Sequence, residues 1–297
     1  MELPVHCELC PRRCGADRRA GAGFCGAGAT LKAARAALHF WEEPCISGRR
    51  GSGTVFFTGC ALRCCYCQNF AVSQQGLGKE LSFHRLAEIF LELQQKGAAN
   101  LNLVTATQWL PWVTAALDEA RAAGLRLPVV WNTGGYETVE TVRALAGYVD
   151  VWLADVKYVS PALAQEYSAA PDYFEVCRAA VAQMLAQAGP PVYDAAGYLT
   201  RGVILRHLAL PGALADSLAV LDYMAGLPQG GFVPSLMSQY TPFYRAAGHR
   251  RLGRRISTWE YRQVVNRAVD LGLTAGYMQE KSSAREEYTP PFDLEGV

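Results

Sequence analysis

The chain of 297 residues lacks a long hydrophobic run, a strong net charge and a leader-like N-terminus. No apolar stretch approaches the roughly 18 residues that suggest a transmembrane helix. The formal net charge is only +1, so composition gives no reason to expect a nucleic-acid or membrane partner. The opening residues MELPVHCELC have neither a basic region nor an apolar core, so we expect no signal peptide.

Several catalytic patterns are missing as well. The sequence shows no repeat, no low-complexity segment and no long linker. It offers no Ser–His–Asp or Cys–His arrangement and no glycine-rich phosphate loop. These absences give no support to a hydrolase of the triad type or a nucleotide-binding loop.

Cysteine, in contrast, is abundant and grouped. Four of the ten cysteines lie within the first 25 residues, and four more lie between Cys60 and Cys67. Closely spaced thiols in a chain without a leader are typical of metal ligands in a reducing compartment, so we expect a cytoplasmic protein. Cys45 and Cys177 stand alone and are expected to be ordinary buried thiols.

The second group contains the most informative motif. In TVFFTGCALRCCYCQNF, Cys60, Cys64 and Cys67 have the spacing C-x3-C-x2-C directly after an apolar run. Three ligands are one short of a closed zinc or iron–sulfur site, so a cluster held by them keeps one iron open. No histidine lies nearby to complete a zinc site, and we interpret Cys65 as a neighbour of the ligands.

The run GCALRCCYCQN resembles the signature of the radical S-adenosylmethionine (SAM) superfamily. The resemblance implies that Cys60, Cys64 and Cys67 hold a [4Fe-4S] cluster whose open iron binds the methionine part of SAM. In that family, reductive cleavage of SAM gives methionine and a 5'-deoxyadenosyl radical, which takes a hydrogen atom from the substrate.

Further runs resemble one branch of the superfamily, the iron–sulfur proteins homologous to pyruvate formate-lyase activating enzyme. These runs are HFWEEPCISG, GSGTVFFTGC, NLVTATQW, WNTGGYE, VDVWLADVKY, LRHLALPG and LMSQYTP. The branch implies a flavodoxin- or ferredoxin-type electron donor, and as substrate a glycine of a partner protein, a peptide or a small molecule. Gln68-Asn69 stands where activases have His-Asn-Pro, which keeps all three substrate classes open.

The remaining pattern alternates short apolar runs with amphipathic segments. Helices are expected at 84–96, from Pro111 to Gly124, after Ser160 and after Thr258. Strands are expected at 54–58, 101–105, 128–132, 149–155, 202–207 and 232–239, with a weaker seventh near 277.

This alternation implies a parallel sheet, either open and doubly wound or closed as a barrel. About six strands favour a partial (β/α)6 TIM-like barrel, the fold that the resemblance also implies. We divide the chain into a cysteine-rich N-terminal extension (1–50), a radical SAM core (51–280) and a C-terminal tail (281–297).

Polar residues follow almost every predicted strand, and in a parallel barrel these ends form the active rim. We expect Arg206 and His207 to contact a carboxylate of the substrate or cofactor. The candidates for SAM contacts are Tyr66, Thr105, Thr107, Asn132, Thr133, Asp155 and Lys157. Each of these could instead be a capping or solvated residue, and Asp155 and Lys157 could simply pair with each other.

Two of these positions depart from relatives in the resembling family. Thr105-Ala106-Thr107 replaces a Gly-Gly-Glu segment that receives the ammonium group of SAM in many members. Asn132 is neutral where the activating enzyme has an acid that helps to hold a monovalent cation. The resemblance therefore leaves such a cation open.

The N-terminal quartet, Cys7, Cys10, Cys14 and Cys25, has the spacing C-x2-C-x3-C-x10-C. Four thiolates suffice for a structural zinc or for an auxiliary iron–sulfur cluster, and the spacing does not separate the two. The surrounding segment is too polar and glycine-rich to form its own core, so a metal would hold it together.

One further segment, 244–255, carries five arginines and a histidine. It is either a solvated face or a docking site for an acidic partner or anionic substrate. For the whole chain, the leading hypothesis is a radical SAM enzyme. The alternative is an iron–sulfur electron carrier or metal-dependent interaction protein without SAM turnover.

Overall fold

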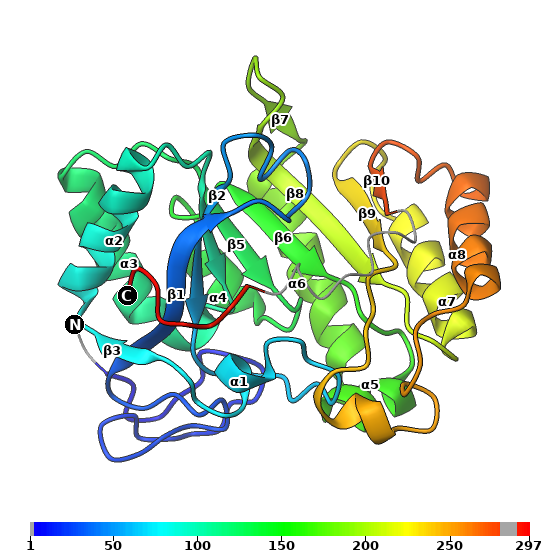
Figure 1. Ribbon diagram of the computed structural model, residues 1–297, viewed down its shortest axis with the longest axis horizontal. Helices are drawn as coiled ribbons and strands as arrows, with labels where there is room; N and C mark the ends of the chain where they lie inside the picture. The colour runs from blue at the N-terminus through cyan, green and yellow to red at the C-terminus, as the bar shows by residue number, and fades with distance from the viewer. Residues whose placement is uncertain (1–2, 280–289) are drawn as a thin grey trace.

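The computed structural model describes residues 3–279 and 290–297. Its centre is a mixed sheet in the order β10-β9-β8-β6-β5-β4-β2-β1-β3, with helices arranged around it (Figure 1). From β2 to β10 every neighbouring pair in that order is parallel. These parallel strands are β2 (Ser52–Phe57), β4 (Leu101–Val104), β5 (Val129–Thr133), β6 (Val151–Asp155), β8 (Leu199–Leu208), β9 (Val233–Met237) and β10 (Tyr277–Met278).

Three antiparallel strands complete the sheet, and helices connect the parallel ones. The antiparallel strands are β1 (Leu31–His39) on β2, β3 (Lys79–Leu81) on β1 and β7 (Val192–Tyr193) on β8. The helices are α1 (Phe70–Ser73), α2 (Phe83–Gln95), α3 (Leu110–Ala122), α4 (Val139–Ala144), α5 (Pro161–Ser168), α6 (Tyr173–Ala188), α7 (Leu214–Ala225) and α8 (Thr258–Asp270), with 3₁₀ turns η1 (Thr107–Trp109) and η2 (Tyr244–Gly248).

The predicted elements are confirmed, including the weak strand near 277. The Ser160 side chain caps α5 as expected, whereas α8 is capped by Ser257, one residue before the predicted Thr258, in a capping box with Glu260. Gly124, with φ of 104°, follows α3 as expected of a helix-ending glycine.

Strand β1 is the clearest element that the sequence pattern did not predict. Its sequence LKAARAALH is rich in helix-forming residues, yet it pairs with both β2 and β3. Pairing on two sides outweighs local propensity. Because β1 belongs to the sheet, the described residues of the expected N-terminal extension that lie outside helix and strand are 3–30 and 40–50.

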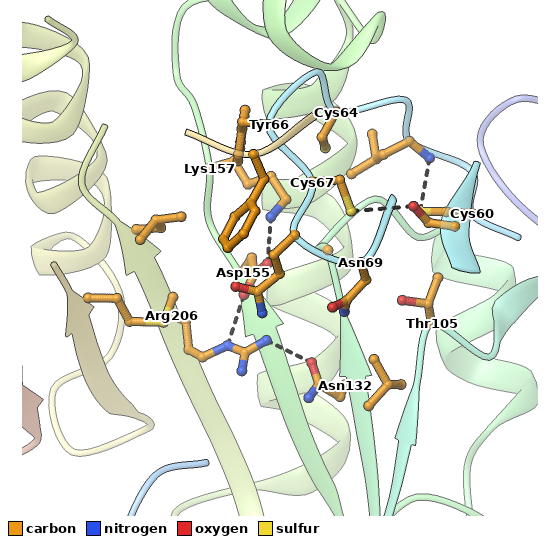
Figure 2. Close-up of a pocket in the computed structure, with 18 of the residues that line it drawn as sticks. Cys60, Cys64, Tyr66, Cys67, Asn69, Thr105, Asn132, Asp155, Lys157 and Arg206 are labelled. Carbon is orange, nitrogen blue, oxygen red and sulfur yellow. Dashed lines mark hydrogen bonds and ion pairs between the residues drawn. The ribbon is translucent and has the colours of Figure 1, made fainter. Parts of the chain in front are cut away.

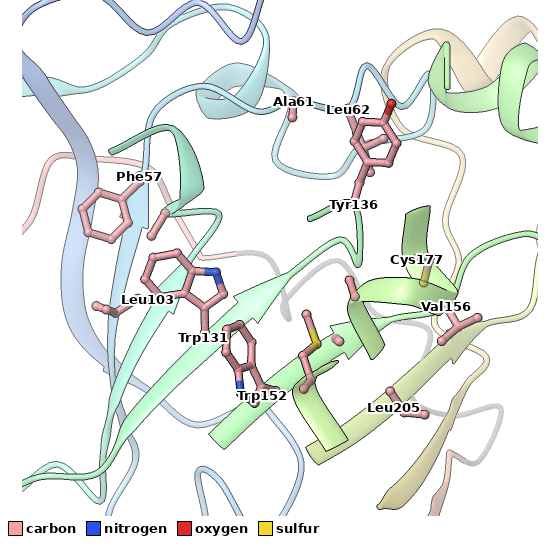
Figure 3. Close-up of a cluster of buried hydrophobic side chains, with 14 of the residues drawn as sticks. Phe57, Ala61, Leu62, Leu103, Trp131, Tyr136, Trp152, Val156, Cys177 and Leu205 are labelled. Carbon is pink, nitrogen blue, oxygen red and sulfur yellow. The ribbon is translucent and has the colours of Figure 1, made fainter. Parts of the chain in front are cut away.

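Successive side chains along each strand point to opposite faces of the sheet. Side chains on one face pack against the helices and form the main core, with Trp131 and Trp152 in edge-to-face contact (Figure 3). A second apolar cluster on the other face includes Cys45, Ile46 and Val130. Both Cys45 and Cys177 are buried, as expected.

The C-terminal residues pack against the sheet. Residues 290–297 run beside β1, where the Ala36 N–H donates to the Glu295 carbonyl and Arg35 pairs with Asp293. Residues 281–289 of the expected C-terminal tail lie outside the described residues. In the described ranges, no helix has the length and apolar character needed to cross a bilayer.

Candidate functional site

A cavity of about 1030 Å³, including its open mouth, lies at the carboxyl ends of the parallel strands. Figure 2 shows that the cysteine loop after β2 forms one wall and that β5, β6 and β8 contribute polar side chains to the other. Its lining includes Cys60, Cys64, Tyr66, Cys67, Asn69, Thr105, Asn132, Thr133, Asp155, Lys157, Arg206, Gln239 and Tyr240. Most of the residues predicted for the rim therefore meet at one site.

The three triad sulfurs each have a polar contact inside the protein. The Leu62 N–H donates to Cys60 Sγ at 3.3 Å, while Cys64 Sγ lies 3.0 Å from Ser168 Oγ. Cys67 Sγ lies 3.3 Å from Ser73 Oγ. Burial raises the pKa of all three thiols, that of Cys67 to about 11.

A glycine gives the loop its turn after β2. Gly59 has a φ of 90°, and a β-carbon there would lie 2.6 Å from the Cys25 carbonyl oxygen. The next N–H, that of Cys60, donates to the same carbonyl at 3.2 Å. Gln108 fixes the turn from the other side, because its amide donates to the carbonyls of Thr58 and Gly59.

The donor set of the triad suits an iron–sulfur cluster that keeps one iron open. Throughout residues 3–279 and 290–297, no three His, Cys, Asp or Glu side chains are arranged to hold one metal ion. A [4Fe-4S] cluster attaches each cysteine to a different iron, so its ligands do not converge on one point. Three sulfurs that line one side of a cavity, with polar contacts to each, match that requirement.

Asp155 is the electrostatic centre of the opposite wall. Its carboxylate pairs with Lys157 Nζ at 2.5 Å and with Arg206 Nε at 2.8 Å. Burial alone would raise the pKa of Asp155, but these two cations outweigh it and lower the pKa. Burial likewise opposes the charge of Lys157, whereas Asp155 and Cys64 raise its pKa, so the ammonium stays charged.

Arg206 is more fully bonded to the protein than the sequence suggested. Besides Asp155, it donates to Glu42 Oε2 at 3.0 Å and to Asn132 Oδ1 at 2.7 Å. The other oxygen of Glu42 accepts from Asn132 Nδ2 at 3.0 Å. Arg206 and Glu42 thus hold Asn132 in place from two sides.

His207 does not line the cavity. It follows Arg206 in β8, so its side chain lies on the opposite face of the sheet. It is 1% exposed, its Nδ1 lies 2.8 Å from the Val156 carbonyl, and burial lowers its pKa to about 4. The expectation that Arg206 and His207 both reach a substrate is therefore corrected by strand alternation.

The three predicted threonines differ in their surroundings. Thr105 lines the cavity in a left-handed conformation with φ of 55°. Thr107 lies behind it and donates to Glu137 Oε1 at 2.6 Å, as does Thr133 at 2.5 Å. Burial raises the pKa of Glu137 to about 7, although both hydroxyl groups lower it.

Tyr66 borders the cavity beside the triad, as predicted. Its hydroxyl lies 2.6 Å from that of Tyr158, and its ring meets Tyr240 edge-to-face. The Tyr158 hydroxyl in turn lies 2.9 Å from Ser168 Oγ, the hydroxyl that contacts Cys64 Sγ. A chain of hydroxyl groups therefore links Tyr66 to Cys64.

Two site residues were not predicted from the sequence. Glu42 follows β1, and with β1 unassigned nothing indicated that it would reach the rim. Asn69 lines the cavity, and its buried Oδ1 accepts no hydrogen bond from the described residues. Its position two residues after Cys67 was the available signal.

A smaller cavity of about 480 Å³ adjoins the first. The two share Asn69, Asn132, Arg206 and Gln239, and the smaller one extends to His39 and Trp41. Trp41 is half exposed, so this cavity reaches the surface beside the end of β1.

The arginine-rich segment 244–255 lies next to the cavity mouth and is partly neutralised. Arg254 pairs with Glu260 and His249 with Glu166, whereas Arg250 and Arg255 are exposed. Phe243 just before it lines the main cavity.

The quartet segment lies against the cysteine loop. Cys7, Cys10 and Cys25 are buried and Cys14 is exposed. Burial raises the pKa of Cys10 to about 12, whereas backbone N–H groups outweigh burial at Cys14 and lower its pKa. Among the described residues, the quartet is not arranged around a single ion, so neither the zinc nor the auxiliary cluster that the sequence left open gains support here.

One known protein resembles most of the chain in sequence. No protein-family model matches the chain. The uncharacterized protein MJ0674 of Methanocaldococcus jannaschii is 27% identical over 280 residues, covering 92% of this chain and 77% of that protein.

Among solved structures, SuiB of Streptococcus suis bound to S-adenosylmethionine matches with a TM-score of 0.50 at 12% identity. The chain shares the fold of SuiB. The match covers 74% of this chain but 48% of SuiB, so the chain spans about half the length of that protein. A radical SAM methyltransferase from Sphaerobacter thermophilus has a TM-score of 0.49 at 15% identity, covering 78% of this chain and 69% of the other.

Proposed function

We propose that this protein is a radical SAM enzyme. One observation carries the proposal: the three thiols of the C-x3-C-x2-C motif and a rim of polar strand-end residues line the same cavity. Cys60, Cys64 and Cys67 would hold a [4Fe-4S] cluster, which with bound SAM would supply a 5'-deoxyadenosyl radical. The fold shared with a SAM-bound protein supports the same reading.

The rim residues suit the charged groups of SAM. Lys157 donates one hydrogen bond, to Asp155, which leaves donors for the methionine carboxylate. Asn69 Oδ1, an acceptor without a donor among the described residues, could receive an N–H or O–H of the cofactor. Arg206, with all three nitrogens bonded to the protein, would position Asp155 and Asn132.

The finer assignments rest on sequence resemblance. We propose membership in the branch homologous to pyruvate formate-lyase activating enzyme, with a partial (β/α)6 barrel and a cytoplasmic location. The substrate would be a protein glycine, a peptide or a small molecule, entering by the smaller cavity beside Trp41. The electron would come from a flavodoxin- or ferredoxin-type donor.

The test is reductive cleavage of SAM. The chain, reconstituted anaerobically with iron and sulfide, should release 5'-deoxyadenosine when dithionite and SAM are added. Cys64→Ala should abolish this release, whereas Cys65→Ala should retain it, because Cys65 does not line the cavity.

Two outcomes would contradict the proposal. One is cleavage that survives Cys64→Ala. The other is a wild-type chain that binds a full cluster but releases no 5'-deoxyadenosine, the result expected of an electron carrier.

A further inference from the structure

The N-terminal segment is ordered without helix or strand. Residues 3–30 form turns, and their apolar side chains are few. Hydrogen bonds tie the turns together: the Cys7 N–H donates to Ala16, and the Gly23 N–H donates to Ala27. A segment of this composition needs a cross-link to hold its shape.

The cysteines of the quartet face one another. A β-carbon at Gly23 would lie 3.2 Å from Cys14 Sγ and 3.7 Å from Cys25 Sγ, so these two sulfurs approach the same point. The Gly26 N–H donates to the Gly23 carbonyl, and this turn brings Cys25 to the same point. A side chain at Gly23 would press against Cys14 Sγ.

A buried cation lies beside the quartet. Arg18 is 0% exposed, and its guanidinium contacts Cys7 Sγ at 4.0 Å. Its other hydrogen bonds go to backbone carbonyls, those of Gly28 and Gln108. The rings of Trp109 and Trp112 cover it at 5.1 and 5.5 Å.

Within the described part of the chain, Arg18 has no carboxylate partner. Carbonyls and ring faces solvate a guanidinium but do not neutralise it, and an uncompensated buried charge is costly. Among the contacts of Arg18 in the described residues, the group that can become anionic is the Cys7 thiol. Four thiolates bound to a metal centre carry a net negative charge and would supply the missing counter-charge.

The quartet also touches the triad. The Cys25 carbonyl accepts the N–H of Cys60 at 3.2 Å, which joins one ligand set to the other through a single hydrogen bond. Arg12, between Cys10 and Cys14, donates to the carbonyls of Ala61 and Ser168 and clamps the segment onto the cluster loop. A centre in the quartet would be a direct neighbour of one in the triad.

We propose that Cys7, Cys10, Cys14 and Cys25 hold an iron–sulfur cluster for which Arg18 is the buried counter-ion. Four thiols in one ordered segment suit the four ligands of such a cluster, and the hydrogen bond from the Cys60 N–H to the Cys25 carbonyl favours a centre that exchanges electrons over a structural zinc. The cluster exchanges one electron with a cluster in the triad, its neighbour. The site itself does not depend on the proposed SAM chemistry, and only this exchange rests on it.

The first test separates the two sites. In the variant Cys60→Ala/Cys64→Ala/Cys67→Ala, anaerobic reconstitution should leave iron and acid-labile sulfide in equal amounts, about two or four of each per chain. Adding Cys10→Ala and Cys25→Ala should remove both. Zinc in place of iron, or no metal, in the triad variant would overturn the proposal.

Because the triad variant could misfold, the wild-type background provides a second measurement. Cys10→Ala/Cys25→Ala should lower the iron content to that of the triad cluster alone and leave reductive SAM cleavage with dithionite measurable. Iron content unchanged by this double substitution would also overturn the proposal. A failure of SAM cleavage in the wild type would instead concern the proposed function.

The role of Arg18 has its own readout. Reduction by dithionite adds one electron to the cluster, and a nearby buried cation stabilises the added negative charge. Arg18→Met in the triad variant should therefore shift the midpoint potential, followed by electron paramagnetic resonance, to a more negative value. Arg19→Met is the matched control, since Arg19 is exposed and pairs with Asp17. Equal potentials in the two variants would refute the counter-ion role.

Discussion

The triad lies in a loop at the end of a sheet strand and faces a cavity, whereas the quartet lies in a segment without helix or strand. The two cysteine sites also differ in how the cation beside each one is paired. Lys157 beside the triad is paired with Asp155, while Arg18 beside the quartet has no carboxylate partner among the described residues. The triad is one ligand short and open to a cofactor. The quartet has four ligands, and tryptophan rings cover the arginine beside it. Open and closed cysteine sites thus lie one hydrogen bond apart.

The largest expected effect is on SAM cleavage, and it distinguishes the triad from the quartet. Cys64→Ala should reduce SAM cleavage by dithionite-reduced protein to background, because the cluster that contacts SAM is lost. Cys10→Ala should lower the rate by no more than about tenfold, because dithionite can reduce the triad cluster directly. Quantifying 5'-deoxyadenosine in parallel checks both. Equal losses would remove the distinction between an open and a closed site.

Glu137 lies between the two sites. It shares a small cavity with Cys60, and its charge also acts on Cys10. Its pKa is raised from 4.5 to about 7, so the folded state holds a proton that the unfolded chain loses. Its stabilising contribution is present below about pH 4.5 and lost as the pH rises through about 7, by at most about 3 kcal/mol.

Glu137→Gln cannot ionise, so it should remove this pH dependence. Thermal unfolding of the reconstituted protein, measured at about pH 5.5 and about pH 8, should show a smaller loss of stability in the variant. A wild-type unfolding midpoint that changes between the two pH values by the same amount as that of Glu137→Gln would show that Glu137 does not titrate in this range.

A substitution at Gly59 tests the contact between the triad loop and the quartet segment. Gly59→Ala would place a β-carbon against the Cys25 carbonyl, whereas Gly76→Ala, at a φ of 76°, would meet open space. Both substitutions strain the backbone, but only the first separates the two segments. Urea unfolding should show a loss larger for Gly59→Ala by about 1–3 kcal/mol. Equal losses would mean that the Cys25–Cys60 contact adds no stability.

The smallest effect concerns the wall opposite the triad. Glu42→Gln removes the carboxylate that accepts from Arg206 and Asn132. Loss of this orientation should weaken SAM binding about tenfold, equivalent to about 1.4 kcal/mol. Equilibrium dialysis with SAM measures it, with exposed Glu80→Gln as control. An unchanged affinity would show that Asp155 alone positions Arg206.

Much of the site could be predicted because parallel strands bring their carboxyl ends together. Asn132, Asp155 and Lys157 reached the cavity for that reason. His207 was misplaced although the information was in the sequence, since adjacent strand residues face opposite sides. Strand β1 could not be predicted locally, because its alanine-rich sequence is paired by strands distant in the chain.

The sequence by itself determined the two ligand sets, their spacing and the strands that carry the rim. These properties depend on residue type and short-range periodicity. Only the tertiary structure decided that Cys25 meets Cys60, that Glu42 reaches Arg206 and that Arg18 is buried beside the quartet. Such contacts join residues far apart in the chain, and they form only when the sheet and the N-terminal segment fold against each other.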